Sequence, residues 1–241
     1  QMCIRDSIKR YGTSIETLAK IKVKASRHAA KNPNAIFNKE VTVDEVLSSP
    51  LIYDPLTRLQ CCPPSCGAAA ALICSESFAK ANNLNCDVFI AGQSMTTDYK
   101  TTFEDHDMRK VVGYDMAKQA AKNVFEETGV SPKDIKVCEL HDCFTTNELI
   151  SYEALGLAEE GEGEQFVLDG DNTYGGKCVT NPSGGLLSKG HPLGATGLAQ
   201  CFELVNQLRG TSGERQVNGV NTALQHNLGL GGACVVTLYQ T

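Results

Sequence analysis

The sequence predicts an α/β fold in layers, with a mixed central sheet covered by helices on both faces. Two observations support this prediction. From Pro63 onward, strand-like apolar runs alternate with helical patterns. The chain then closes with two strand patterns, VNTALQ and ACVVTLY, joined by a glycine-rich run. In such folds, ligands bind outside the carboxyl ends of the strands, where loops converge.

Four helices and two further strands are expected along the chain. The helices are 14–31, 67–83, about 117–128 ending at Gly129, and 198–209, and the strands are 86–92 and 135–140. Lys22 interrupts the apolar face of the first helix, which is therefore expected to be half buried. The opening QMCIRDS shows neither the helical nor the strand repeat of apolar residues, and residues 1–7 are suspected not to be native. The apolar stripe of the last helix consists of Leu198, Cys201, Phe202, Val205 and Leu208.

Composition narrows the classes of function. The chain has 241 residues, enough to bury a core, and a net charge of -6 with scattered Lys and Arg, which argues against a nucleic-acid partner. Eleven cysteines without a secretory leader favour a reducing compartment. No second cysteine pair accompanies the cluster at 61, 62 and 66, so no metal site is expected. No apolar run approaches the roughly 20 residues that span a bilayer, so the sequence predicts a soluble chain.

A histidine and a cysteine stand two residues apart at the end of the 135–140 strand. In an extended segment, His141 and Cys143 point to the same side and Asp142 to the other. The unperturbed pKa of a thiol, about 8.5, lies close enough to neutrality for proton transfer once neighbours adjust it. The alternative is a structural histidine beside a small buried cysteine, and the pair alone leaves both interpretations open.

Two glycine-rich loops contain further histidines. In NPSGGLLSKGHPLGATG, residues 181–197, glycines on both sides of His191 allow the backbone to approach a ligand closely. In QHNLGLGG, residues 225–232, His226 and Asn227 precede glycines whose backbone N–H groups could stabilise an oxyanion. Each loop could instead be a plain connection, with His226 at the surface. Three histidines at three element ends together favour one shared site.

The motifs HDCF, GDNTYGGK, NPSGGLLSKGHPLGATGLAQC and LQHNLGLGGACVVTLY resemble the thiolase superfamily, specifically the sterol-carrier-protein (type X) thiolases. Most other thiolases have a different tetrapeptide at 141–144 and a cysteine in place of His226. The resemblance covers nearly all of the chain after residue 10. It implies a thiolase-like layered fold and an acyltransferase that cleaves 3-oxoacyl-CoA with CoA, or catalyses the reverse Claisen condensation, through an acyl-cysteine intermediate.

The resemblance also implies roles for individual residues. Cys143 would be the acid/base, His191 would activate the nucleophile, and His191 and His141 would hold the thioester oxygen. A second oxyanion site would be bordered by His226, Asn227, Leu228 and Gly229. The pantetheine channel would be lined by Asn181, Ser183, Gly184 and Gly185. CoA and acyl-CoA would be substrates, with no permanently bound cofactor. The full-length protein would be a homodimer acting in peroxisomal oxidation of fatty acids or sterol side chains, although this chain shows no targeting signal.

By the same resemblance, the chain is expected to be a fragment. Residues 1–59 would be a remnant of the thiolase loop region, 60–83 the end of the N-terminal half, and 84–241 the C-terminal domain. The nucleophilic cysteine of thiolases lies upstream of these residues, so the chain alone is expected to be inactive. One alternative is a non-catalytic acyl-CoA or lipid-binding relic of the same fold. A self-contained hydrolase using Cys143 and His141 is a third interpretation.

Overall fold

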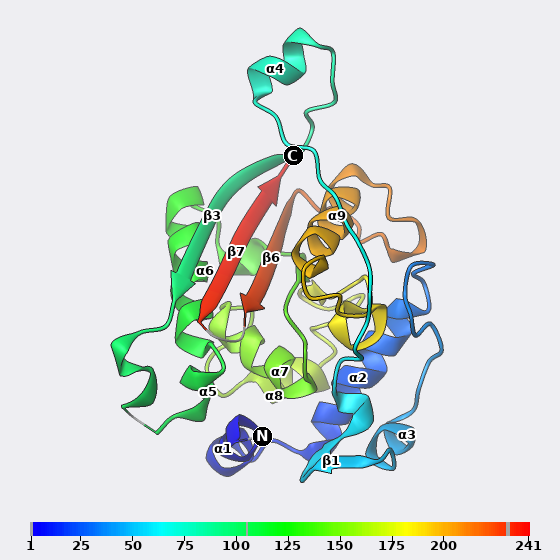
Figure 1. Cartoon of the computed structure of the whole chain (residues 1–241), viewed down its shortest axis with the longest axis vertical. Coiled ribbons are helices and arrows are strands. Elements are labelled where there is room, and N and C mark those ends of the chain that lie inside the picture. Colours follow the sequence, from blue (N-terminus) through cyan, green and yellow to red (C-terminus); the bar gives the residue numbers. More distant parts are fainter. Residues whose placement is uncertain (1, 105, 230–231) are drawn as a thin grey trace.

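A five-stranded sheet forms the centre of the molecule in the computed structural model, which describes residues 2–104, 106–229 and 232–241 (Figure 1). The strand order is β3-β7-β6-β4-β5. β7 pairs antiparallel with β3 and β6, whereas β4 runs parallel to β6 and β5. The predicted mixed sheet is thus confirmed. Its strands are β3 (Phe89–Thr97), β4 (Val137–Glu139), β5 (Val179–Thr180), β6 (Thr222–Gly229) and β7 (Ala233–Gln240).

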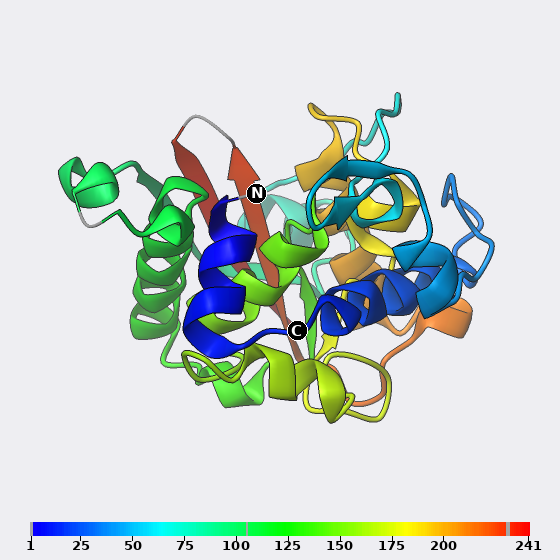
Figure 2. The ribbon, with the colours of Figure 1, turned by 90° about the horizontal axis from the view of Figure 1, so that it is seen from below.

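Helices cover both faces of this sheet, as the sequence predicts. α6 (Tyr114–Thr128) packs against β3 and β7, and α9 (Thr196–Arg209) packs against β6 and β4. Side chains alternate between the two faces of a strand. Consecutive residues of β4 therefore pack in two different hydrophobic clusters. Val137 packs in the cluster beneath α9, and Cys138 in the larger cluster beneath α6. α7 (Thr145–Ala154) contacts both α6 and α2 (Ile15–Ala29), and so joins the N-terminal segment to the sheet (Figure 2).

The remaining elements are short, apart from α1. α1 runs over Met2–Tyr11 and packs on α5, with Ile4 and Ser7 buried, so the opening of the chain is helical although its sequence shows no clear period. Whether residues 1–7 are native stays a prediction. The other elements are α3 (Val43–Leu47), α4 (Glu76–Ala81), α5 (Met108–Val111), α8 (Gly163–Leu168) and the antiparallel pair β1 (Leu51–Tyr53) and β2 (Leu56–Thr57).

The first predicted helix is α2, and it is more deeply buried than expected. Ser14 caps it by accepting a hydrogen bond from the Thr17 N–H, at 3.0 Å. The expectation of half burial was wrong because Lys22 is only 3% exposed. Its Nζ donates to the Leu187 carbonyl at 2.7 Å, so this amine finds its partner inside the protein rather than in water.

The predicted helix at 67–83 was wrong over its first half. α4 begins only after Ser75, whose hydroxyl accepts from the Phe78 N–H. Residues 67–74 have no helical structure, and Leu72 and Ile73 are 106% and 76% exposed. Alanine has a high helix propensity, but a short helix is marginal unless it buries an apolar face, and Leu72 and Ile73 are exposed. Figure 1 shows α4 standing away from the body of the molecule.

The other predicted elements form with shifted bounds. The strand expected at 86–92 is β3, which starts and ends later, and the one at 135–140 is the shorter β4. Both closing strands are confirmed. β6 runs through His226 to Gly229, so this histidine lies in a strand rather than in a loop. Leu230 and Gly231, in the predicted glycine-rich connection, lie outside the described residues.

The last predicted helix is confirmed as α9, but its apolar stripe was only partly right: Leu208 and Cys201 pack in the cluster beneath α9. Leu198 and Phe202 are 41% and 52% exposed, whereas Gln200 and Glu203 are buried. Gln200 donates to the His226 carbonyl at 3.2 Å. Polar pairing of α9 with the sheet therefore accompanies the apolar contact made by Leu204 and Leu208.

Candidate active site

Three histidines from separate parts of the sequence meet at one end of the sheet. The rings of His141 and His191 lie edge to face with centroids 5.1 Å apart. The backbone N–H of His141 donates to Nδ1 of His226 at 3.4 Å. His141 follows β4 directly, and Asn147 of α7 donates its side-chain amide to the His141 carbonyl. The structure therefore brings the three histidines together, and their predicted roles stay predictions.

The hydrogen bonds of His191 fix which ring nitrogen carries its proton. Nδ1 lies 2.7 Å from the Thr196 hydroxyl, and that hydroxyl donates its only proton to the Pro192 carbonyl. Thr196 must therefore accept from an Nδ1–H, which leaves Nε2 with a free lone pair in the neutral ring. Burial, and then the positive charge of Lys189, lower the pKa of His191. Near neutral pH, His191 can act as a base at Nε2.

His226 has the opposite tautomer. Its Nδ1 accepts the bond from His141, so the proton of the neutral ring is on Nε2. Nε2 is buried and has no partner among the described residues. Burial lowers the pKa of His226 to about 4, so the ring is neutral at pH 7. The structure thus presents a neutral N–H donor with no internal acceptor.

His141 has an unpaired nitrogen as well. Its Nδ1 is buried without a partner in the described part of the chain. Burial and, after it, the nearby charges of His226 and His191 lower the pKa of His141 to about 3. Buried polar atoms are nearly always paired in folded proteins, so unpaired nitrogens at two adjacent rings mark a candidate ligand site.

Cys143 lies two residues beyond His141 and is partly buried. Burial, and then the charge of Cys62, raise the pKa of the Cys143 thiol to about 12. The group is therefore a thiol near neutral pH and can donate a proton. Its backbone carbonyl accepts from the Cys62 N–H at 2.9 Å.

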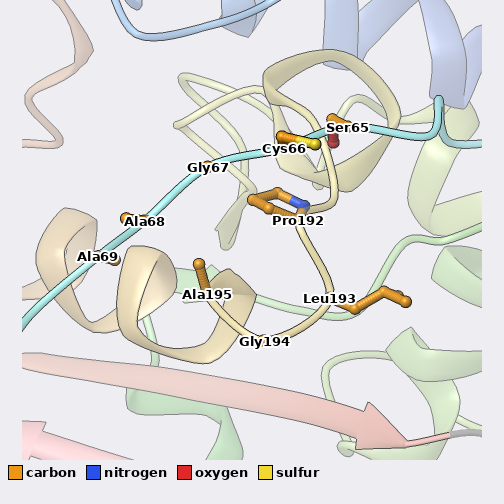
Figure 3. A pocket seen from close by; sticks show the side chains of 9 residues that line it. All are labelled: Ser65, Cys66, Gly67, Ala68, Ala69, Pro192, Leu193, Gly194 and Ala195. Atoms are coloured by element: carbon orange, nitrogen blue, oxygen red, sulfur yellow. The ribbon is translucent and has the colours of Figure 1, made fainter.

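A segment that we call the strap, residues 61–70, links Cys143 to the loop that carries His191. At one end, Cys61 forms an antiparallel bridge with Phe144. Further along, Ser65 accepts a hydrogen bond from the backbone N–H of His191 at 2.7 Å. Figure 3 shows the strap continuing across Pro192, where a side chain at position 67 would press on the proline ring. Sequence reasoning considered the strap cysteines as metal ligands or as the nucleophile, and missed the strap itself.

Asp142 fixes the glycine-rich loop from the other side of the 140–144 segment. It is fully buried, and its carboxylate accepts from the Leu186 N–H at 2.7 Å and the Leu187 N–H at 3.4 Å. A β-carbon at Gly185 would collide with this carboxylate, and one at Gly184 with Ala29 of α2. These two glycines therefore permit close packing within the protein. Their predicted role in substrate binding stays a prediction.

Asn181 and Ser183 are buried in the same loop. Asn181 adopts a left-handed conformation, with φ of 51°, and its Oδ1 accepts from the Leu140 N–H at 2.7 Å. Ser183 donates its hydroxyl to Glu139 at 2.8 Å. Burial raises the pKa of this glutamate to about 7. Ser183 also borders a cavity of about 390 Å³ between the strap and α9, lined further by Lys189 and Phe202.

The remaining predicted residues surround His226 in β6. Asn227 donates its side-chain amide to Gln200 at 3.0 Å. Leu228 is 9% exposed, and its side-chain end lies 2.6 Å from where a β-carbon at Gly113 would be. Gly229 ends the strand. Their predicted oxyanion role stays a prediction. Within the described ranges, no group of His, Cys, Asp and Glu side chains is arranged to hold a metal ion, and no helix is long and apolar enough to cross a membrane.

Comparisons with known proteins find relatives that match nearly the whole chain. Sterol carrier protein 2 of Oryctolagus cuniculus is 58% identical over 98% of this chain and 43% of its own length. The acetyl-CoA acetyltransferase of Methanothermobacter thermautotrophicus is 39% identical over 99% of this chain and 61% of its own length. The chain thus spans about half the length of these relatives.

Solved structures share the fold. The Ltp2-ChsH2(DUF35) aldolase superposes with a TM-score of 0.81 at 24% identity, over 100% of this chain and 62% of the other. Human mitochondrial 3-ketoacyl-CoA thiolase superposes with a TM-score of 0.68 at 18% identity, over 100% of this chain and 59% of the other. The sequence model of the family described as "Thiolase C-terminal domain-like" matches residues 98–239. The chain therefore belongs to the thiolase C-terminal domain-like family.

Proposed function

We propose that the complete protein is a thiolase-type acyltransferase that cleaves 3-oxoacyl-CoA with CoA, or catalyses the reverse Claisen condensation. One observation carries the proposal. His141 contacts both the ring of His191, which has a base nitrogen, and the ring of His226, which has a donor nitrogen. The Cys143 thiol is two residues from His141 in the sequence. These are the groups that acyl transfer between thioesters requires.

The first step forms the acyl-cysteine. We infer that the nucleophilic cysteine belongs to a part of the protein outside this chain, as in the thiolases that the sequence resembles. Nε2 of His191 takes the proton of that thiol, and the sulfur attacks the 3-oxo carbon. The oxygen of the tetrahedral intermediate accepts from the Nε2–H of His226. A donor of this kind stabilises the transition state by about 2.7–4 kcal/mol.

The second step breaks the carbon–carbon bond. As the 3-oxo carbonyl re-forms on the acyl-cysteine, the α-carbon leaves as an enolate of the shortened thioester. The enolate oxygen is held by the protonated Nε2 of His191 and by His141, and the Cys143 thiol gives its proton to the α-carbon. The raised pKa of Cys143 suits this donation, because the thiol is fully protonated beforehand.

The third step releases the acyl group. The Cys143 thiolate takes the proton of incoming CoA, and the CoA sulfur attacks the acyl-cysteine. The nucleophile leaves and recovers its proton from His191, so both products are acyl-CoA thioesters and every group returns to its starting state. We further propose a homodimer acting in peroxisomal oxidation of fatty acids or sterol side chains, on the grounds of the family resemblance.

The direct test compares two cysteine variants of the complete protein. Cys143→Ala removes the proposed proton carrier, and we expect kcat for cleavage of a 3-oxoacyl-CoA to fall by about 10²–10⁴-fold. Cys201→Ala, a partly buried cysteine on α9, is the control and should retain activity. Unchanged turnover in Cys143→Ala would contradict the assignment. A wild-type protein that binds acyl-CoA in calorimetry but forms no product would instead support the non-catalytic relic.

A further inference from the structure

Two cysteines face each other across the bridge between the strap and the 140–144 segment. Cys61 and Phe144 form an antiparallel bridge, so the next residue along the strap, Cys62, is opposite Cys143. The Cys62 N–H donates to the Cys143 carbonyl at 2.9 Å, as expected for a directly opposed pair. Opposed residues of an antiparallel pair project their side chains to the same face.

The spacing of such a pair suits a covalent bond between the sulfur atoms. In regular antiparallel geometry, the Cα atoms of a hydrogen-bonded pair lie about 5.5 Å apart. Disulfides in proteins have Cα separations of about 4.4–6.8 Å, so this register needs little backbone movement. The pKa of Cys143 responds to the charge of Cys62 next after burial, which is consistent with neighbouring sulfur atoms.

The other nearby cysteine is directed elsewhere. Cys61 packs against the main core cluster, and its thiol donates to the Thr57 carbonyl at 3.5 Å. Successive residues of an extended segment point to opposite faces. Cys62 is therefore the strap cysteine on the side of Cys143. Both members of this pair are partly exposed, so a small oxidant can reach them.

We propose that Cys62 and Cys143 are a redox modification site, at which hydrogen peroxide or a similar two-electron oxidant closes a reversible disulfide. The thiolate of one cysteine attacks peroxide, the O–O bond breaks, and a sulfenic acid and water form. The second sulfur then attacks the sulfenic sulfur, the S–S bond forms, and the hydroxyl group leaves as water. Two thiols and one peroxide give one disulfide and two waters.

Local electrostatics determine the rate and the reversibility of this reaction. Burial raises the pKa of Cys62 to about 11, below that of Cys143, so Cys62 is the more readily ionised of the two. We therefore assign the first attack on peroxide to Cys62. Neither thiolate is stabilised, so little thiolate is present and oxidation is slow. For the same reason, the reduced form is not stabilised relative to the disulfide. A small thiol in excess reverses the bond by exchange.

The consequence for activity rests on the proposed function. A disulfide at Cys143 removes the proton that this residue would give to the α-carbon, and ties the strap to the 140–144 segment. Oxidation would then stop turnover without touching the nucleophile. The chemical site itself does not depend on that role, and its test needs no substrate.

The test maps the disulfide by mass spectrometry in the intact chain. The reduced protein is treated with hydrogen peroxide, free thiols are alkylated, and the digest is searched for linked peptides. We expect a peptide containing Cys62 joined to one containing Cys143, abolished by dithiothreitol. The link should be lost in Cys62→Ser, and should persist in Cys61→Ser and Cys138→Ser, which separate the proposed pair from its sequence neighbours.

Two outcomes would overturn the site. One is a link that persists in Cys62→Ser, and the other is full alkylation of Cys143 after oxidation in a protein whose circular dichroism is unchanged. An activity measurement on the complete protein distinguishes the site from the proposed function. If the link forms and is reversed by dithiothreitol while turnover is unaffected, the disulfide site stands and the proton-carrier role of Cys143 fails.

Discussion

The two sides of the 140–144 segment are built differently. On one side, the buried carboxylate of Asp142 accepts two backbone N–H bonds from the glycine-rich loop. On the other, His141 and His226 are also buried, yet each has a ring nitrogen with no partner in the described part of the chain. An unpaired buried polar group costs about 1–3 kcal/mol. The Asp142 carboxylate is thus paired with the loop that it supports, whereas ring nitrogens of His141 and His226 are left free where we propose that substrate binds.

Among the buried polar groups near this segment, we expect the largest loss of stability on breaking the pair Lys24 and Glu148, which ties α2 to α7. Lys24 also donates to Thr180. Lys24→Met leaves a buried carboxylate without its partner and should lower the free energy of unfolding by about 3–5 kcal/mol, measured by urea denaturation. Lys20→Met, at an exposed pair on the same helix, should cost less than about 1 kcal/mol. Equal effects of the two variants would contradict the comparison.

Removal of Asp142 should have the next largest effect. Asp142→Ala leaves the N–H groups of Leu186 and Leu187 without an acceptor, and we expect a loss of about 2–3 kcal/mol in the free energy of unfolding. Asp169→Ala, at an exposed carboxylate, is the control. A variant as stable as the wild type would mean that the loop does not depend on this carboxylate.

Lowering the pH should reduce the free energy of unfolding, because buried histidines are held neutral in the folded protein. Burial lowers the pKa of His28 to about 3. Below about pH 6.5, His28 binds a proton in the unfolded chain but stays neutral in the folded protein. The free energy of unfolding therefore falls as the pH is lowered from about 6.5 toward 4. Glu139 has the opposite effect on the free energy of unfolding. Its pKa is raised in the folded state, so protonation at low pH favours the folded protein.

The contribution of one histidine can be isolated by substitution. His28→Gln should flatten the dependence of unfolding free energy on pH by about 1.4 kcal/mol per unit between pH 6 and 4. Urea denaturation at several pH values measures this slope. Parallel curves for the variant and the wild type would show that His28 is not held neutral.

The smallest effect on stability is expected on the unpaired side. His226→Asn keeps an acceptor for the His141 N–H but removes the free Nε2–H. We expect the free energy of unfolding to change by less than about 1 kcal/mol, while kcat of the complete protein falls by about 10²-fold. A large loss of stability with unchanged turnover would mean that His226 is structural.

Periodicity predicted the sheet, α2, α6 and α9, because each buries enough surface for its pattern to decide the structure. The periodicity failed to predict segments whose structure depends on contacts with residues distant in the sequence. Alanines at 68–71 predicted a helix, but the side chains of Leu72 and Ile73 are exposed, so the segment buries no apolar helical face. Likewise, α9 buries Gln200 and Glu203 rather than Phe202, because their partners on the sheet and at Arg215 are invisible in a helical pattern.

Sequence motifs located the three histidines, since each follows or precedes a regular element in a distinctive loop. They could not reveal the strap, whose contacts with Phe144 and His191 join residues more than 80 positions apart. Nor could they assign protons, which depend on the hydroxyl of Thr196 and the backbone of His141. The glycines at 184 and 185 also have a use that sequence did not show, as close packing against Ala29 and Asp142.

The protonation of the histidine cluster tests the account most directly. Nitrogen chemical shifts of ¹⁵N-labelled protein report the tautomer of each ring between pH 5 and 8. We expect a neutral His191 with its proton on Nδ1 and a neutral His226 with its proton on Nε2 at pH 7. A charged ring at either position, or the reverse tautomers, would remove the base and the donor on which the proposed chemistry depends.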